Sequence, residues 1–183
     1  MPPSDSGPIL AGVPHRKVGA PSATVKSYAD RFAFRIVAFN PSGQIAISHP
    51  WNTPPKHRLP GGFIDSPSNL DAAARHELEW ETGGRIRLQE GPPVASTEEW
   101  QSVEEVGVRQ ITVCYLAELV ETVEEDGVTD EMLNAKLKLE WMGVEEARKA
   151  VSGEEPTTEV GRWIRERDWF FLDVATAGLK SQE

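Results

Sequence analysis

Two glutamates four positions apart, Glu77 and Glu81, are the residues of this sequence best placed to do chemistry. They fall within residues 69–82, where apolar side chains recur with the period of an α-helix. The broad apolar face of this helix is formed by Leu70, Ala73, Ala74, Leu78 and Trp80, and Asp71, Arg75 and Glu79 lie opposite. On a helical wheel the two carboxylates fall in the middle of the apolar face, where desolvation and mutual repulsion both disfavour them.

A bound cation would compensate for this placement. A hard divalent ion accepts carboxylate oxygens as ligands and neutralises both charges, and the small side chains of Ala73 and Ala74 leave room on that face. The alternative is a helix that is only partly covered, so that Glu77 and Glu81 reach solvent at an open edge. Helix periodicity alone does not separate these two interpretations.

Other residues near this helix could take part in substrate binding or catalysis. Lys56 and Arg58 precede a pair of glycines and could meet phosphate oxygens, although scattered surface charge explains them nearly as well. Trp51 and Trp80 could form an aromatic wall of a cleft, and plain core packing is an equal alternative for Trp80. His76 lies at the edge of the wheel and is a candidate acid or base, because histidine changes charge near neutral pH.

Local patterns predict the elements that position these residues. Ser68 is a suitable N-cap for the helix at 69–82, and residues 82–84, Thr-Gly-Gly, supply its end. Residues 59–62, Leu-Pro-Gly-Gly, precede it, and two glycines let the backbone bend sharply or approach a ligand. Upstream, residues 32–39 and 44–48 are predicted strands joined by a turn at 40–43.

The rest of the chain completes a predicted α/β fold. Strands are expected at 85–88, 108–119 and 137–142, with a polar loop after the first and an acidic loop after the second. Helices are expected at 144–151 and 158–174, the latter with Val160, Trp163, Ile164, Phe170, Phe171 and Val174 on its inner side. Together these elements predict an α/β/α sandwich with a central mixed β-sheet. Residues 1–27 are expected to be a flexible N-terminal tail, or an added strand at most, and residues 28–183 to form the domain.

Composition narrows the class of protein. The chain has 183 residues, with 19 Lys and Arg against 29 Asp and Glu and a formal net charge of -10, which disfavours extended nucleic acid as a partner. No apolar run approaches the roughly 20 residues needed to cross a bilayer, and no signal peptide is evident, so we expect a soluble cytoplasmic protein. The single cysteine, Cys114, lies in an apolar run and is expected to be a small strand residue rather than a nucleophile.

Residues 62–84 resemble the Nudix box of the Nudix hydrolases. The family pattern is Gly, five free positions, Glu, seven free positions, then Arg-Glu-apolar-free-Glu-Glu-free-Gly-apolar. Its first glycine falls on Gly62, the central glutamate on Glu77, the apolar position on Leu78, the last glutamate on Glu81 and the closing glycine on Gly83, without a gap. The order of strands and helices from about residue 28 to residue 174 is also similar to the family fold.

Three positions depart from this pattern. Ser68 stands where the family has a glutamate, and His76 stands where it has the arginine that pairs with that glutamate. Trp80 stands where the family has one of the glutamates that hold magnesium, and an indole cannot bind a hard cation through oxygen. The box therefore predicts a metal site that is weaker than that of the family.

The resemblance implies hydrolysis of a diphosphate with the help of Mg²⁺ or Mn²⁺. By resemblance, Glu77 is the main ligand and possible base, Glu81 the second ligand and the carbonyl of Gly61 a third oxygen. The family often adds an acidic residue from a later loop, for which Asp130 or Glu131 is available. Two carboxylates can still hold one ion weakly when substrate phosphates supply further oxygens.

Three functions remain compatible with the sequence. The first is a metal-dependent hydrolase of a small diphosphate-containing metabolite, either a nucleoside diphosphate derivative or an isoprenyl-type diphosphate. The second is a Nudix fold turned to non-hydrolytic chemistry on an apolar small molecule, with Trp80 and His76 replacing the lost metal chemistry. The third is a binding module without turnover. A homodimer is possible in each case, because Nudix-like domains often dimerise.

Overall fold

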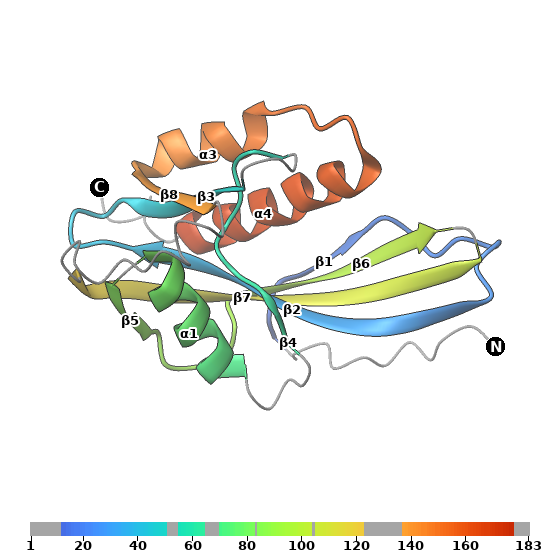
Figure 1. Ribbon diagram of the computed structural model, residues 1–183, viewed down its shortest axis with the longest axis horizontal. Coiled ribbons are helices and arrows are strands. Elements are labelled where there is room, and N and C mark those ends of the chain that lie inside the picture. Colours follow the sequence, from blue (N-terminus) through green and yellow to red (C-terminus); the bar gives the residue numbers. More distant parts are fainter. Residues whose placement is uncertain are drawn as a thin grey trace.

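The described residues form an eight-stranded sheet with helices on both faces (Figure 1). The computed structural model describes residues 12–50, 55–64, 70–82, 84–103, 105–122 and 137–177. The strands are β1 (His15–Val18), β2 (Ser27–Phe39), β3 (Ile45–Pro50), β4 (Phe63–Ile64), β5 (Gly84–Leu88), β6 (Ala95–Val103), β7 (Val106–Thr122) and β8 (Leu137–Met142). The helices are α1 (Leu70–Thr82), α3 (Val144–Gly153) and α4 (Glu159–Ala177). This is the predicted α/β/α sandwich.

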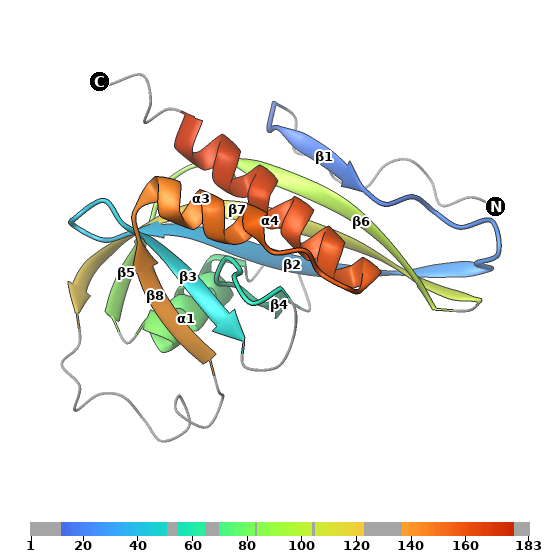
Figure 2. The ribbon, with the colours of Figure 1, turned by 90° about the horizontal axis from the view of Figure 1, so that it is seen from above.

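The sheet is mixed, as predicted. Its strand order is β1-β6-β7-β2-β3-β8, with β4 beside β2 and β5 beside β7. The pairs β2–β7 and β1–β6 are parallel, and the others are antiparallel. The long strands β2, β6 and β7 continue past the helices, and β1 lies at the outer edge beside β6 (Figure 2).

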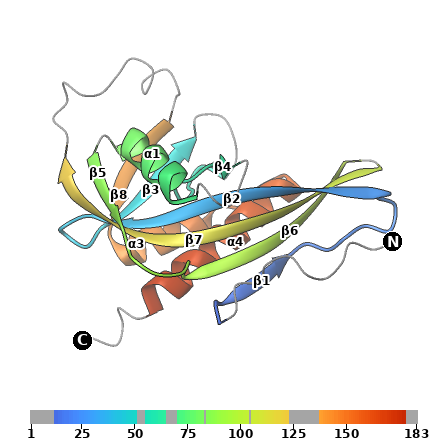
Figure 3. The same ribbon diagram turned by 90° about the horizontal axis from the view of Figure 1, so that it is seen from below.

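Two hydrophobic cores lie on opposite faces of the sheet. On one face α1 covers only the end of the sheet where β3, β5 and β8 lie (Figure 3). The buried core there consists of Phe34, Ile36, Ala38, Ala46, Ala74, Ile86, Leu88, Tyr115, Ala117 and Leu119. On the other face α3 and α4 cover Val37, Ile45, Ile47, Leu59, Ala95, Cys114 and Met142, to which they add Ala147, Val151, Phe171 and Leu172. Neighbouring residues of β2 thus alternate between the two cores.

One strand lies where the sequence predicted a polar loop. β6 pairs with β7 along its whole length, from Ala95 beside Cys114 to Val103 beside Val106. Its inward positions include Thr97 and Glu99, both fully buried, so the apolar alternation that marks a strand is missing. β1 lies within the predicted N-terminal tail, where an added strand was one of the two expectations.

The inner side of α4 also differs from its prediction. Val160, expected on that side, is 45% exposed, and the buried positions include Arg167 and Asp168. A hydrophobicity pattern cannot reveal charged side chains that are buried in pairs, and these two residues are bonded to each other.

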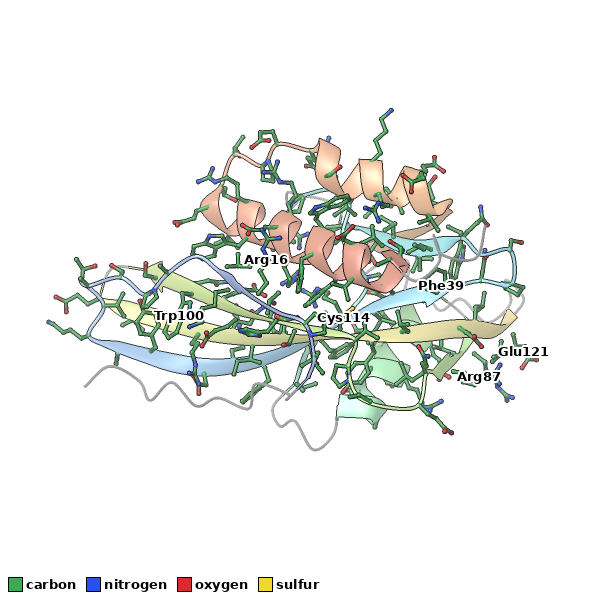
Figure 4. The ribbon with its side chains drawn as sticks, turned by 180° about the vertical axis from the view of Figure 1, so that it is seen from behind. Arg16, Phe39, Arg87, Trp100, Cys114 and Glu121 are labelled. Atoms are coloured by element: carbon green, nitrogen blue, oxygen red, sulfur yellow. The ribbon has the colours of Figure 1, made fainter. Side chains whose placement is uncertain are left out.

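Local turn and strand predictions agree with the structure. The turn at 40–43 is closed by a hydrogen bond from Gly43 N to Asn40 O, and β8 has the predicted bounds. Cys114 is fully buried in the middle of the sheet beneath α4, where burial raises the pKa of its thiol, while Trp100 lies toward the extended end (Figure 4). None of the helices in the described parts of the chain is long and apolar enough to span a bilayer.

Candidate functional site

Glu77 and Glu81 lie one turn apart on α1 and are both partly buried. The neighbouring Ala74 is fully buried in the core between α1 and the sheet, so this part of the helix approaches the strands closely. The small side chain at that position lets the two longer carboxylates extend along the sheet surface. The helix thus carries two like charges into a region with limited access to water.

Glu81 is the more perturbed of the two carboxyl groups. Burial, followed by the negative charge of Glu77, raises the pKa of Glu81 to about 7. Ser48 on β3 donates a hydrogen bond of 3.1 Å from Oγ to Glu81 Oε2, which favours the charged form and opposes this rise. Burial also raises the pKa of Glu77, while the positive charges of His76 and Arg35 lower it. Without a cation Glu81 is therefore only partly ionised near neutral pH.

Gly61 and Gly62 place a stretch of bare backbone beside this pair. Their segment is bonded to β2 by hydrogen bonds from Phe34 N to Gly62 O at 3.0 Å and from Ile36 N to Pro60 O at 2.9 Å. Successive carbonyls of an extended segment point in opposite directions, so the Gly61 carbonyl is directed away from β2. A side chain at Gly62 would begin 3.6 Å from the Glu77 carboxyl carbon.

Gly61 itself cannot be replaced without strain. Its φ of +151° lies in a region that residues with a side chain rarely adopt. A Cβ there would collide with the carbonyl oxygen of Phe34 and would lie 3.0 Å from Arg35 Nη1. The guanidinium of Arg35 fills the space that a side chain at Gly61 would need.

A comparison with known protein families identifies the family of this chain. The NUDIX domain family matches residues 29–164. The chain belongs to the Nudix family.

Solved structures with a similar fold include two with MutT in their descriptions. The MutT protein from Methanosarcina mazei Go1 is 15% identical, with a TM-score of 0.47, and the match covers 86% of this chain and 99% of that one. The MutT NUDIX hydrolase from Burkholderia pseudomallei is 19% identical, also with a TM-score of 0.47, and the match covers 75% of this chain and 97% of that one. A search among curated proteins gives no match.

Two of the three departures from the Nudix box lie on described parts of α1. His76 is exposed beside Glu77, where it supplies a positive charge that lowers the pKa of that carboxyl. Trp80, which lies between Glu77 and Glu81 in the sequence, is partly buried. Ser68, the third departure, lies outside the described residues, as do Trp51, Asp130 and Glu131.

The basic residues that precede the Nudix box are held by the connection between α3 and α4. The backbone N–H of Lys56 donates a 2.5 Å hydrogen bond to Glu154 Oε2, and His57 Nδ1 is 3.7 Å from the same oxygen. Arg58 donates from Nε to the Pro55 carbonyl at 3.0 Å, and burial lowers the pKa of its guanidinium. The structure therefore brings the Lys56 amide and the His57 ring to Glu154.

The donors near the Nudix box suit one hard cation. Glu77, Glu81 and the Gly61 carbonyl offer oxygen atoms, the ligand type that Mg²⁺ and Mn²⁺ prefer. Within the described ranges no group of three or more acidic, histidine or cysteine side chains is placed to hold a metal ion. Two carboxylates that repel each other fit a single cation with part of its coordination left for water or phosphate.

Two polar residues that act on the carboxylate pair, Ser48 by a hydrogen bond and Arg35 by its charge, were not predicted from the sequence. Ser48 lies on β3 two positions after Ala46, on the α1 side of the sheet, so a hydroxyl on an otherwise apolar strand face was the available signal. Arg35 lies within the apolar run of β2, and its side chain is only 8% exposed. A lone arginine inside an apolar strand could have marked it.

Proposed function

We propose that this chain is a divalent-metal-dependent hydrolase of a small diphosphate-containing metabolite. A nucleoside diphosphate derivative and an isoprenyl-type diphosphate are the two substrate types considered. The supporting observation is the pair Glu77 and Glu81, two neighbouring carboxylates that are partly buried within a Nudix box and whose raised pKa values a bound cation would lower.

Each residue has a separate part in this proposal. Glu77 and Glu81, with the carbonyl of Gly61, would hold one Mg²⁺ or Mn²⁺ ion, and Glu131 would add a ligand from a later loop. When bound, the ion supplies positive charge to the phosphate oxygens and makes a nearby water easier to deprotonate. Glu77 serves as the base that accepts the proton of the attacking water. Ser48 keeps Glu81 turned inward through its hydrogen bond.

Substrate contacts are assigned to the remaining residues predicted from the sequence. Lys56 and Arg58 are proposed to meet phosphate oxygens, and Trp51 and Trp80 to line the cleft for the rest of the molecule. His76, exposed on α1 beside Glu77, is proposed as an acid that assists the leaving group.

The direct test is phosphate release from a panel of diphosphates in Mg²⁺, in Mn²⁺ and in chelator. Glu77→Gln should lower the rate by roughly 10²–10⁴, the range for loss of an acid–base group, with the fold intact. Glu79→Gln is the matched control, because Glu79 is an exposed glutamate of the same helix. Full activity in chelator would rule out the proposed mechanism.

A second candidate is a Nudix fold with non-hydrolytic chemistry or ligand binding alone. It is favoured by the partly buried Trp80 at the position of a family metal ligand, and by the lack of a third acidic ligand among the described residues. Turnover of an apolar ligand that is insensitive to metals would select this candidate. Binding measured by calorimetry without any product would reduce it to a binding module.

A further inference from the structure

A cluster of charged side chains is buried between α4 and the sheet. Arg167 and Asp168 are adjacent on α4, are 1% and 0% exposed, and are joined by a 2.8 Å bond from Arg167 Nε to Asp168 Oδ1. Arg167 Nη1 also lies 3.4 Å from Glu99 Oε2 on β6. Burial alone would lower the pKa of Arg167, but Asp168 and Glu99 together raise it above its ordinary value.

Besides their contacts with Arg167, Glu99 and Asp168 accept hydrogen bonds from different parts of the chain. Glu99 accepts hydrogen bonds from residues of the sheet, 2.8 Å from Thr112 Oγ1 and 3.2 Å from Gln110 Nε2. Asp168 instead accepts a 3.0 Å hydrogen bond from the backbone N–H of Leu59 through Oδ2. Only the second carboxylate therefore reaches the segment that leads into the glycine pair.

The segment from Arg58 to Gly62 is held from three directions. Arg58 exchanges two backbone hydrogen bonds with Ser48 on β3, at 2.8 and 3.0 Å. Leu59 is bound by Asp168 on α4, and Gly62 is bound to β2 through Phe34. The bond from Asp168 is the one contact in this set made by a charged side chain.

Stability does not explain why such a cluster is buried here. Replacing a buried ionic group with apolar residues of similar volume is often neutral or stabilising, because desolvation offsets the attraction between the charges. A buried carboxylate with hydrogen bonds of fixed direction does, however, hold its partners in one geometry.

We infer that Asp168 is a positioning residue of the proposed metal site. By binding the Leu59 amide, it fixes the following backbone as far as Gly62, where a Cβ would lie 3.6 Å from the Glu77 carboxyl carbon. The inference rests on the proposed function, because it assigns the Gly61 carbonyl as a metal ligand. It extends the site to a helix on the opposite face of the sheet.

Two variants separate positioning from simple stabilisation. Asp168→Asn and Glu99→Gln each remove one buried carboxylate charge next to Arg167 at nearly constant volume. Leu59 N–H and Arg167 Nε donate to different oxygens of Asp168, Oδ2 and Oδ1, and asparagine replaces one of these acceptors with an NH₂ donor. Glu99→Gln leaves the bond to Leu59 in place and is the matched control.

The readout is Mn²⁺ affinity, measured by calorimetry at a temperature where both variants are folded. Asp168→Asn should weaken binding roughly tenfold to a hundredfold, as is typical when support for a metal ligand is lost, and Glu99→Gln should leave it unchanged. Equal affinity in Asp168→Asn and the wild type, or equal loss in both variants, would overturn the inference. Absence of Mn²⁺ binding to the wild type would instead reject the proposed function.

A second measurement needs no variant. If the Leu59 amide and the metal site are coupled, bound Mg²⁺ must strengthen the bond to Asp168, because coupling between two sites is reciprocal. Hydrogen exchange at the Leu59 amide should therefore slow when Mg²⁺ is added to the wild type. The amide of Ala147, bonded to Gly143 O at the start of α3, is the reference and should not change. Unchanged exchange at Leu59 while calorimetry records Mg²⁺ binding would contradict the inference.

Discussion

Replacing Glu81 with glutamine should stabilise the metal-free protein at alkaline pH. The pKa of Glu81 is raised to about 7 in the folded chain, chiefly by burial and then by the charge of Glu77. In the unfolded chain the same carboxyl titrates near its ordinary value of 4.5. Between these two values the folded state binds more protons than the unfolded state, so the free energy of unfolding falls as pH rises.

The size of this effect follows from the two pKa values. A rise from 4.5 to about 7 corresponds to about 3 kcal/mol, at roughly 1.4 kcal/mol per pKa unit. Glutamine carries no charge at any pH and escapes this loss. The stability difference between Glu81→Gln and the wild type should therefore grow in favour of the variant from pH 4 to pH 8, by up to about 3 kcal/mol.

Urea denaturation in chelator, at several values between pH 4 and pH 8, measures this difference. Subtracting the wild type from the variant removes the contribution of every other titrating group. Glu79→Gln is the control, since its side chain is exposed and a glutamine oxygen can still accept the 3.5 Å hydrogen bond from Ile86 N, so it should not reproduce the trend. A difference that is independent of pH, or that turns against the variant as pH rises, would refute the placement of Glu81 in a poorly solvated site.

Substitutions at the glycine pair and at Ser48 give further predictions. Gly61→Ala should lower the free energy of unfolding by about 1–3 kcal/mol, because a Cβ meets the β2 backbone at a positive φ; urea denaturation tests this. Gly62→Ala should leave the free energy of unfolding close to that of the wild type but weaken Mn²⁺ binding in calorimetry, because the added carbon lies beside Glu77. Unchanged affinity would contradict this. Ser48→Ala should raise the pKa of Glu81 further, so Mn²⁺ affinity should fall more at pH 7 than at pH 9, where protons no longer compete; an equal fall at both values would count against it.

Elements with local signals could be predicted from the sequence. The turn at 40–43, the helix that became α1 and the strand at 137–142 each depend on nearby residue types, whether turn formers, helix caps or alternation. β6 was missed because its inward side chains include Thr97 and Glu99. Thr97 donates to Glu99 within the strand, and the other partners of Glu99 lie on β7 and α4. A buried polar residue can be predicted only when its hydrogen-bond partner is known, and Thr112 and Arg167, which bind Glu99, are distant from it in sequence.

The same limit applies to the candidate site. Its helical part, Glu77 and Glu81, could be proposed from spacing on one element. Ser48, Arg35 and Asp168 act on the site or its support from β3, β2 and α4, respectively, and no spacing rule connects them to the Nudix box. Arg35 illustrates the difficulty: burial, followed by the charge of Arg167, lowers its pKa to about 10, and neither cause is visible in a linear pattern.

Charge balance distinguishes the two buried polar regions of this fold. On the α4 face, two guanidinium groups, Arg35 and Arg167, are matched by two carboxylates, Glu99 and Asp168. On the α1 face, Glu77 and Glu81 repel each other, and only the more distant Arg35 and the exposed His76 offset them. The α4 cluster is balanced in charge, although Arg35 Nε and Arg167 Nη2 are buried without a hydrogen-bond partner, and it can serve as a support. The unbalanced pair on the α1 face instead favours binding of protons or a cation. The catalytic site is therefore expected on the α1 face, and the α4 face is expected to hold the segment from Arg58 to Gly62 in place beside it.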